Sequence, residues 1–291
     1  TINITLPTLA FSVNQFYPFR RANPVGKMRW YEQISMKYNL DAENRYNTVD
    51  SNFLQGNWPD SMQNGMRHSY PISATFRVLK YFNWSNSINL TDRMYLKTIR
   101  RYYQADTLYE GADTILPGYK MRNVSGFANA IDFSMSSSLN TRIYGMYQFK
   151  GNGLIKAIRH MVTPSVSFYY TPDWGAPGLG YYRTIDNDTN LTNPVSYSIF
   201  QGSVYGSPPG QKSGAISFAI SNNLEIKVRN LKDTVNGVKK IPLIDDFTIR
   251  CSYDLAKDSL NWSPITLSGR STIIKGLTIS YGSVWNIYAR D

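Results

Sequence analysis

Cysteine, histidine and long apolar runs are all scarce in this chain of 291 residues, and each scarcity excludes a class of protein. A single cysteine, Cys251, excludes an internal disulfide and a cysteine-based metal cluster. The two histidines, His68 and His160, are far apart and lack the Cys or His partners of a metal site. No window approaches the roughly 18 consecutive apolar residues of a transmembrane helix, which excludes a helical membrane protein.

The residues that are plentiful favour strands and an anionic partner. The chain has 22 Tyr, 13 Phe and 6 Trp, together with many Ser, Thr and Asn. Lys and Arg number 31 against 20 Asp and Glu, giving a formal charge of +11. Nucleic acid, acidic lipid and lipopolysaccharide would all suit this charge. The basic residues are spread along the whole chain instead of lining one compact groove, which argues against nucleic acid.

Apolar and polar residues alternate with period two along most of the chain. The clearest example is SGAISFAISNNLEIKVR, residues 213–229, which is longer than the roughly 5 or 6 residues of a globular strand. Membrane-spanning strands need about 9 to 11 residues. Similar runs predict about twelve strands: 2–13, 30–42, 68–80, 83–99, 119–135, 139–150, 158–171, 195–205, 213–229, 243–255, 262–274 and 276–288. Longer polar connections are expected at 43–67, 100–118 and 172–194, and Pro7 predicts a bulge or an edge in the first strand.

Charged side chains are segregated onto the polar positions of these runs. A lipid-facing Arg or Lys at mid-bilayer would cost about 2 to 4 kcal/mol, so a membrane wall explains the segregation. The solvated face of a soluble β-sandwich is the alternative, but strand length and tyrosine content favour a membrane barrel. The polar face would then be a net-basic lumen carrying ten candidate residues: Arg77, Arg93, Lys97, Lys120, Arg122, Arg142, Lys227, Arg229, Arg250 and Arg270.

An Arg-His pair occurs twice, each time shortly before a proline. Arg67-His68 and Arg159-His160 are candidates either for a repeated catalytic or ligand site or for structural residues. The chain has no Gly-x-Ser-x-Gly elbow, no His-Glu-x-x-His motif and no phosphate-binding glycine loop before a helix. We therefore expect both pairs to lie at strand starts, as rim anchors, and we assign no catalytic, cofactor-binding or metal-binding residue.

Six stretches carry a resemblance to a known family: LPTLAFSVNQFYPFRR, VGKMRWYEQISMKY, NGMRHSYPISATFRVLKYFNWS, IRHMVTPSVSFYYTPDW, YSIFQGSVYGSPPGQKSGAISFAISNNLEIKVR and DSLNWSPITLSGRSTI. In this order, and over nearly the whole chain, they resemble the barrel region of Bacteroidota-type LptD, the outer-membrane lipopolysaccharide-assembly proteins. The resemblance implies a large antiparallel transmembrane β-barrel that transports lipid without catalysis. It also implies a lateral gate between the first and last strands of the barrel, to which no residue of this chain is assigned.

The resemblance implies a set of partners and a domain organisation. The partners are lipopolysaccharide, outer-membrane lipids, an LptE-like plug lipoprotein and an LptA-like periplasmic bridge protein. Residues 1–291 would be a single barrel region, about twelve strands of a bigger barrel, without the family's N-terminal periplasmic jelly-roll. One cysteine cannot form the inter-domain disulfides of some relatives. Two other functions stay open at this point: a porin or receptor-type outer-membrane barrel, and a soluble β-rich adhesin or sugar-binding module.

Overall fold

The computed structural model describes most of the chain. Its described residues are 2–23, 25–48, 62–104, 108–110, 113–115, 118–151, 153–185, 195–230, 237–274 and 277–288. Parts of the predicted connections 43–67, 100–118 and 172–194 lie outside these residues. No helix among them is long and apolar enough to cross a membrane.

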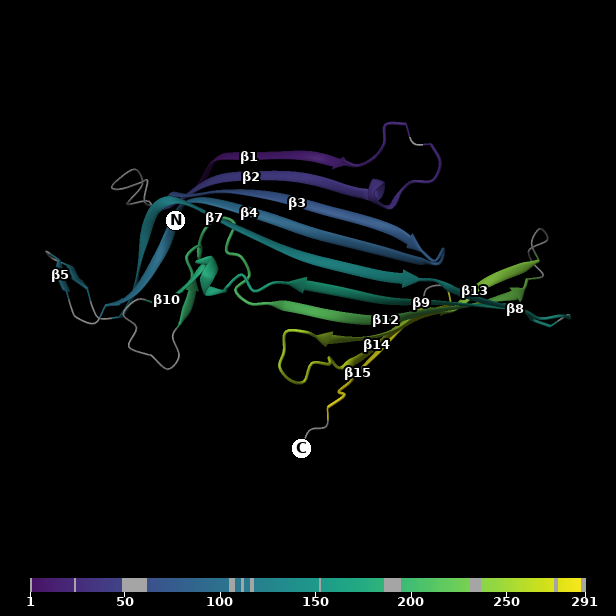
Figure 1. Ribbon diagram of the computed structural model, residues 1–291. Coiled ribbons are helices and arrows are strands. Elements are labelled where there is room, and N and C mark those ends of the chain that lie inside the picture. Colours follow the sequence, from purple (N-terminus) through teal and green to yellow (C-terminus); the bar gives the residue numbers. More distant parts are fainter. Residues whose placement is uncertain are drawn as a thin grey trace. The chain divides into compact units, whose positions relative to one another are not determined.

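Nearly all of the regular structure is strand (Figure 1). The long strands are β1 (Ile2–Phe16), β2 (Ile34–Thr48), β3 (Met62–Val78), β4 (Phe82–Gln104), β7 (Gly118–Thr141), β8 (Ile143–Gln148), β9 (Ile155–Thr171), β12 (Ser213–Arg229), β13 (Val238–Asp254), β14 (Ile265–Ile274) and β15 (Leu277–Trp285). The short elements are β5 (Leu108–Glu110), β6 (Asp113–Ile115), β10 (Tyr182–Thr184), β11 (Ser196–Ser198) and the 3-10 turns η1 (Trp30–Gln33) and η3 (Pro177–Leu179).

The long strands form one antiparallel sheet of eleven strands. The order is β1-β2-β3-β4-β7-β9-β12-β13-β14-β15, and β8 also pairs with β9. The register of β1 on β2 shifts between Thr5 and Thr8, so the bulge predicted at Pro7 is confirmed. β5 with β6, and β10 with β11, form two separate two-stranded sheets. The predicted antiparallel, all-β fold class is confirmed.

Several predicted boundaries are corrected by the structure. The strand at 213–229 is confirmed, but β2 extends to Thr48, β3 begins at Met62 and β4 extends to Gln104. The expected break between 119–135 and 139–150 is wrong, because Ser136–Ser138 lie inside β7 and pair with Ser167–Tyr169 of β9. The small serine side chains leave room for a bulky neighbour on β4, since the Trp84 indole N–H donates to Ser137 Oγ at 2.8 Å.

The strand predicted at 195–205 is also wrong beyond its first residues. Only Ser196–Ser198 are extended, as β11. After them the chain turns repeatedly: Gln201 N–H donates to the Ser198 carbonyl, Ser203 N–H to Phe200 and Gly206 N–H to Ser203. Gly202 and Gly206 have positive φ, which glycine adopts readily, so the chain can coil at this point and bury Phe200.

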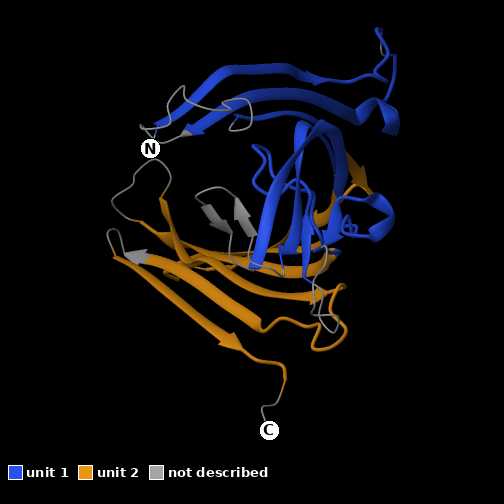
Figure 2. Ribbon diagram, turned by 90° about the vertical axis from the view of Figure 1, so that its left-hand side faces the viewer, with its two compact units in different colours: residues 1–73, 88–134, 171–212 blue, residues 74–87, 135–170, 213–291 orange. Residues whose placement is uncertain are grey.

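The chain divides into two compact units (Figure 2). Unit 1 comprises residues 1–73, 88–134 and 171–212, and unit 2 comprises residues 74–87, 135–170 and 213–291. The buried hydrophobic clusters of unit 1 join β4 and β7 to the connection between β9 and β12. Elsewhere, large apolar side chains at every second position of a strand are exposed, as Phe218 and Ile220 are in β12. We call these positions the apolar parity of a strand and the positions between them its polar parity. Exposed apolar surface of this kind marks a face that contacts a membrane or a partner.

Candidate functional site

The ten predicted basic residues lie on or beside the long strands. Arg77, Arg122, Arg142, Lys227, Arg229, Arg250 and Arg270 are exposed, whereas Arg93, Lys97 and Lys120 are half-buried. Arg142 lies between β7 and β8, and the others lie within strands. Arg270 stands opposite Asp246 in the register of β13 on β14, so its charge faces a carboxylate across the strands. The strands therefore present basic side chains, but some of that charge is compensated locally.

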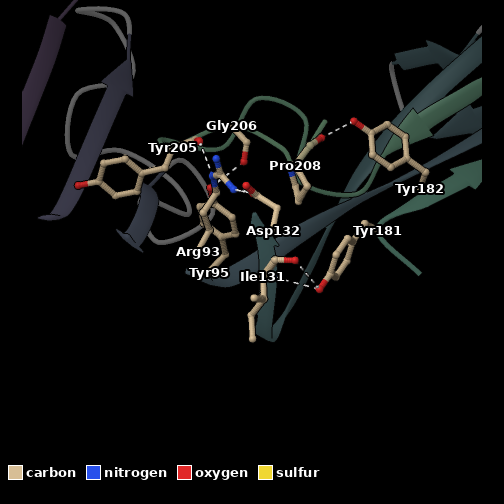
Figure 3. A network of polar contacts seen from close by, with 9 residues as sticks. All are labelled: Arg93, Tyr95, Ile131, Asp132, Tyr181, Tyr182, Tyr205, Gly206 and Pro208. Carbon is tan, nitrogen blue, oxygen red and sulfur yellow. Dashed lines mark hydrogen bonds and ion pairs between the residues drawn. The ribbon is translucent and has the colours of Figure 1, made fainter. Parts of the chain in front are cut away.

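Arg93 on β4 is an ion-paired residue instead of a free lumenal cation. Its Nη1 donates to Asp132 Oδ2 on β7, and its Nε donates to the Tyr205 carbonyl at 3.2 Å (Figure 3). Both charged side chains are largely buried, being 15% and 11% exposed. A buried pair of this kind is costly to break, because removing one partner leaves an uncompensated charge. Arg93 therefore joins two strands to a connecting segment.

The connecting segment that Arg93 contacts comprises residues 172–212 and joins β9 to β12, and we call it the folded connection. Residues 172–185 and 195–212 of it are described. Its Phe200 is 1% exposed and packs against Tyr95 of β4, with ring centroids 5.3 Å apart. Tyr95 Oη donates to the Gly206 carbonyl at 2.7 Å, and the Tyr181 hydroxyl accepts from Ile131 N at 3.0 Å (Figure 3). Side chains on the polar parity of β4 and β7 are thus covered by the folded connection.

Backbone groups strengthen this attachment. Ile99 N–H of β4 donates to the Ile199 carbonyl at 2.9 Å, and Arg101 N–H donates to Tyr197 Oη at 3.0 Å. Within the connection, Tyr182 Oη donates to the Pro208 carbonyl at 2.7 Å. Alternation along the sequence does not predict this packing. Composition gives no signal for it either, because the aromatic share of this stretch is close to the 14% of the whole chain.

A cavity of about 430 Å³ in unit 1 brings two of the predicted residues together. Arg67 of β3 and Arg93 of β4 both line it, along with Asn39 and Asp41 of β2 and Thr91 of β4. Arg67 Nη2 donates to Asp41 at 2.7 Å, and its guanidinium lies 4.9 Å from the Tyr205 ring centroid. Its Nε is buried and has no hydrogen-bond partner among the described residues. The cavity is therefore polar, with most of its charge paired.

The two side chains of the Arg67-His68 pair lie on different faces of β3 and contact different partners. Consecutive residues of a strand point to opposite faces, so Arg67 faces Asp41 while His68 faces the apolar side. His68 Nδ1 lies 2.8 Å from Tyr38 Oη, and its ring is stacked on Tyr70. The expected position at a strand start is also wrong, because β3 begins at Met62. Anchoring by the pair stays a prediction.

The Arg159-His160 pair follows the same rule in unit 2. Arg159 Nε lies 3.4 Å from Glu225 Oε2 of β12, whereas His160 Nε2 lies 3.2 Å from Asn222 Oδ1. β9 begins at Ile155, so this pair also lies inside its strand and not at its first residues. Arg159 and Lys227 line one small cavity, so the structure brings together a predicted anchor and a predicted lumenal residue.

Several groups outside the eleven-stranded sheet have shifted pKa values, Glu32 and Tyr182 among them. The pKa of Glu32, in η1, is lowered to about 2 because its carboxylate accepts hydrogen bonds from the Arg21 side chain and the Arg29 backbone. In the folded connection, partial burial raises the pKa of Tyr182, and the Asp173 carboxylate adds to the effect. Among the described residues, no group of three or more His, Cys, Asp or Glu side chains could hold a metal ion.

Long antiparallel strands with an exposed apolar parity and a charged polar parity are typical of membrane-spanning β-proteins. The particular family follows from comparison with family models, in which the model described as LptD protein matches residues 1–288. The chain belongs to this family, as the resemblance predicted. Comparison with curated proteins and with solved structures gave no match. Membership supports a role in lipopolysaccharide transport and assembly at the outer membrane, which is a transport function and not an enzymatic one.

Proposed function

We propose that the chain is the barrel component of an outer-membrane translocon that assembles lipopolysaccharide into the outer leaflet. The match to the LptD family over residues 1–288 carries the proposal. The strands support it, since each offers an apolar parity for lipid and a polar parity for sugar and phosphate. In this proposal residues 1–291 act as a single barrel region, and the polar parity forms a net-basic lumen.

Electrostatics supports a basic path along part of this lumen. Arg142, Arg229, Arg250 and Arg270 are exposed, so an anionic glycolipid can reach all four, although Arg270 shares its charge with Asp246 opposite it. Arg93 contributes little to such a path, because Asp132 neutralises it and Tyr205 covers it. The partners in this proposal are lipopolysaccharide, an LptE-like plug lipoprotein and an LptA-like bridge protein that delivers the lipid.

The test replaces Arg142, Arg229, Arg250 and Arg270 together with Gln. We expect less lipopolysaccharide at the cell surface and greater sensitivity to detergent, because the polar path loses four positive charges. A matched control removes four charges from the connections and β10, at Arg20, Arg183, Lys212 and Lys257, and should leave both readouts unchanged. Unchanged surface lipopolysaccharide in the first variant would contradict the basic-lumen mechanism, and normal assembly after depletion of the protein would contradict the proposed function itself.

A further inference from the structure

A small cavity on the polar parity of unit 2 collects an excess of positive charge. Its volume is about 100 Å³, and its lining includes Arg159 of β9, Glu225 and Lys227 of β12, and Lys240 of β13. Among the described residues that line it, three side chains are cationic and one is anionic. The cavity thus carries a net charge of two positive units.

The two lysines are placed against each other by the strand register. Lys227 and Lys240 are directly paired between β12 and β13. Side chains opposite each other in an antiparallel pair have Cβ atoms about 4.5 to 5.5 Å apart, and like charges in this position destabilise the sheet. The neighbouring pairs, Val228 with Lys239 and Arg229 with Val238, each have only one charge. The like-charged pair therefore coincides with the cavity.

Arg159 completes the cluster from the adjacent strand. Glu225 lies 3.4 Å from its Nε, so the one carboxylate of the cavity is already engaged by the arginine. Neither lysine gains a carboxylate of its own from the lining. An anion between the lysines would relieve their repulsion and form charge-assisted hydrogen bonds.

We propose that Arg159, Lys227 and Lys240 form a binding site for a dianionic phosphate group, as carried by a phosphorylated sugar. A phosphate monoester has a charge near −2 at neutral pH, which matches the two excess positive charges. Lys and Arg are the side chains that bind phosphate best. The site rests on the described geometry, and its use for the phosphates of a transported glycolipid rests on the proposed function.

The experiment measures binding to the full chain in maltoside micelles, which contain no phosphate. Glucose 6-phosphate and inorganic phosphate are titrated separately, and phosphorus NMR follows the bound fraction. The test variant is Lys227→Gln with Lys240→Gln. The control is Lys156→Gln with Lys239→Gln, which removes the same charge from the same or adjacent strands at positions facing the opposite side.

We expect both probes to bind the parent and the control, and binding to weaken at least about tenfold in the test variant, because two charge-assisted hydrogen bonds are lost. Tighter binding of glucose 6-phosphate would identify a sugar phosphate as the ligand, and equal binding would show that free phosphate suffices. Binding of glucose 6-phosphate to the parent should also weaken below about pH 6, where its phosphate becomes a monoanion. No binding to the parent, or equal loss in test and control variants, would overturn the site. Since the readout is binding by the purified chain, that result would not contradict the transport proposal, which the arginine experiment above tests separately.

Discussion

An ion pair between Arg21 and the buried Glu32 organises the connection between β1 and β2. Glu32 is 1% exposed, and its Oε1 lies 2.5 Å from Arg21 Nε. The same carboxylate accepts from Arg29 N–H at 2.6 Å through its other oxygen, so both oxygens are used. Charge-assisted hydrogen bonds of this kind are stronger than neutral ones. One acidic side chain therefore fixes three parts of this connection.

Acidification should loosen this connection. The folded-state pKa of Glu32 is about 2, below its ordinary value of 4.5, so its stabilisation is complete above pH 4.5 and is lost as the pH falls toward 2. We expect the protection of the peptide spanning residues 17–33 against hydrogen exchange, taken relative to the unfolded-chain rate at each pH, to fall over this interval. Glu32→Gln should show fast exchange at every pH, whereas the exposed-site control Asp258→Asn should behave like the parent. A parent whose exchange protection did not change in this range would contradict the assignment.

The Arg-His pairs illustrate what residue types do and do not predict. Their proximity in sequence suggests a joint role, but strand geometry sends the two side chains of each pair to opposite faces. Alternation alone predicts that separation, once the strand is known to extend past the pair. The partners, Asp41 for Arg67 and Glu225 for Arg159, depend on cross-strand register, which a single sequence does not determine.

Among the elements, the folded connection packs onto unit 1 through a few aromatic residues. Phe200→Ala should destabilise it by about 3 to 5 kcal/mol, because a fully buried ring is removed from contact with Tyr95 and Tyr181. Limited proteolysis should then cut within residues 172–212. Leu179→Ala is the control, since Leu179 is 43% exposed in the same connection. Equal protease resistance of the two variants would show that Phe200 does not hold the connection in place.

A close backbone approach within the connection gives a second prediction. A Cβ added to Gly175 would lie 2.3 Å from the Gly210 carbonyl oxygen, so the chain would have to shift. Gly175→Ala should cost about 1 to 3 kcal/mol, as overpacking does. Gly178→Ala meets nothing within 4 Å and should be nearly neutral. Thermal unfolding, monitored by protease cleavage of the connection at increasing temperature, distinguishes the two variants. Equal stability of the two would contradict the close approach of Gly175 to Gly210.

Strands and connection differ in how far the sequence predicts them. Alternation predicts β12 to the residue, because the two faces of this strand meet different surroundings. In the serine-rich part of β7 the predicted break between 119–135 and 139–150 is wrong, because cross-strand pairing with β9 holds the chain extended there. The folded connection buries Phe200 through contacts with β4 and β7, and such distant contacts leave no local period.

At the scale of the whole molecule, the apolar parity of the sheet should face lipid. A spin label introduced at each of residues 216–221 of β12, after replacement of Cys251 by Ser, should report a period of two in accessibility to oxygen. Labels at Phe218 and Ile220 should be accessible to oxygen, and a label at Ser217 should be accessible to a water-soluble nickel complex. Uniform accessibility to the nickel complex, with a monodisperse monomer in the absence of detergent, would instead support a soluble β-protein.

The attachment of the folded connection to β4 also constrains the order in which the protein can be built. Tyr95 and the Gly206 carbonyl are 111 positions apart in the chain. Contacts of such separation form late, because the loop between them must be closed first. During synthesis and insertion, Tyr95 and Ala130 remain uncovered until the chain beyond Phe200 has arrived. A truncated polypeptide that ends before that point would expose this apolar interior surface, which is the kind of surface that quality-control proteases and chaperones recognise.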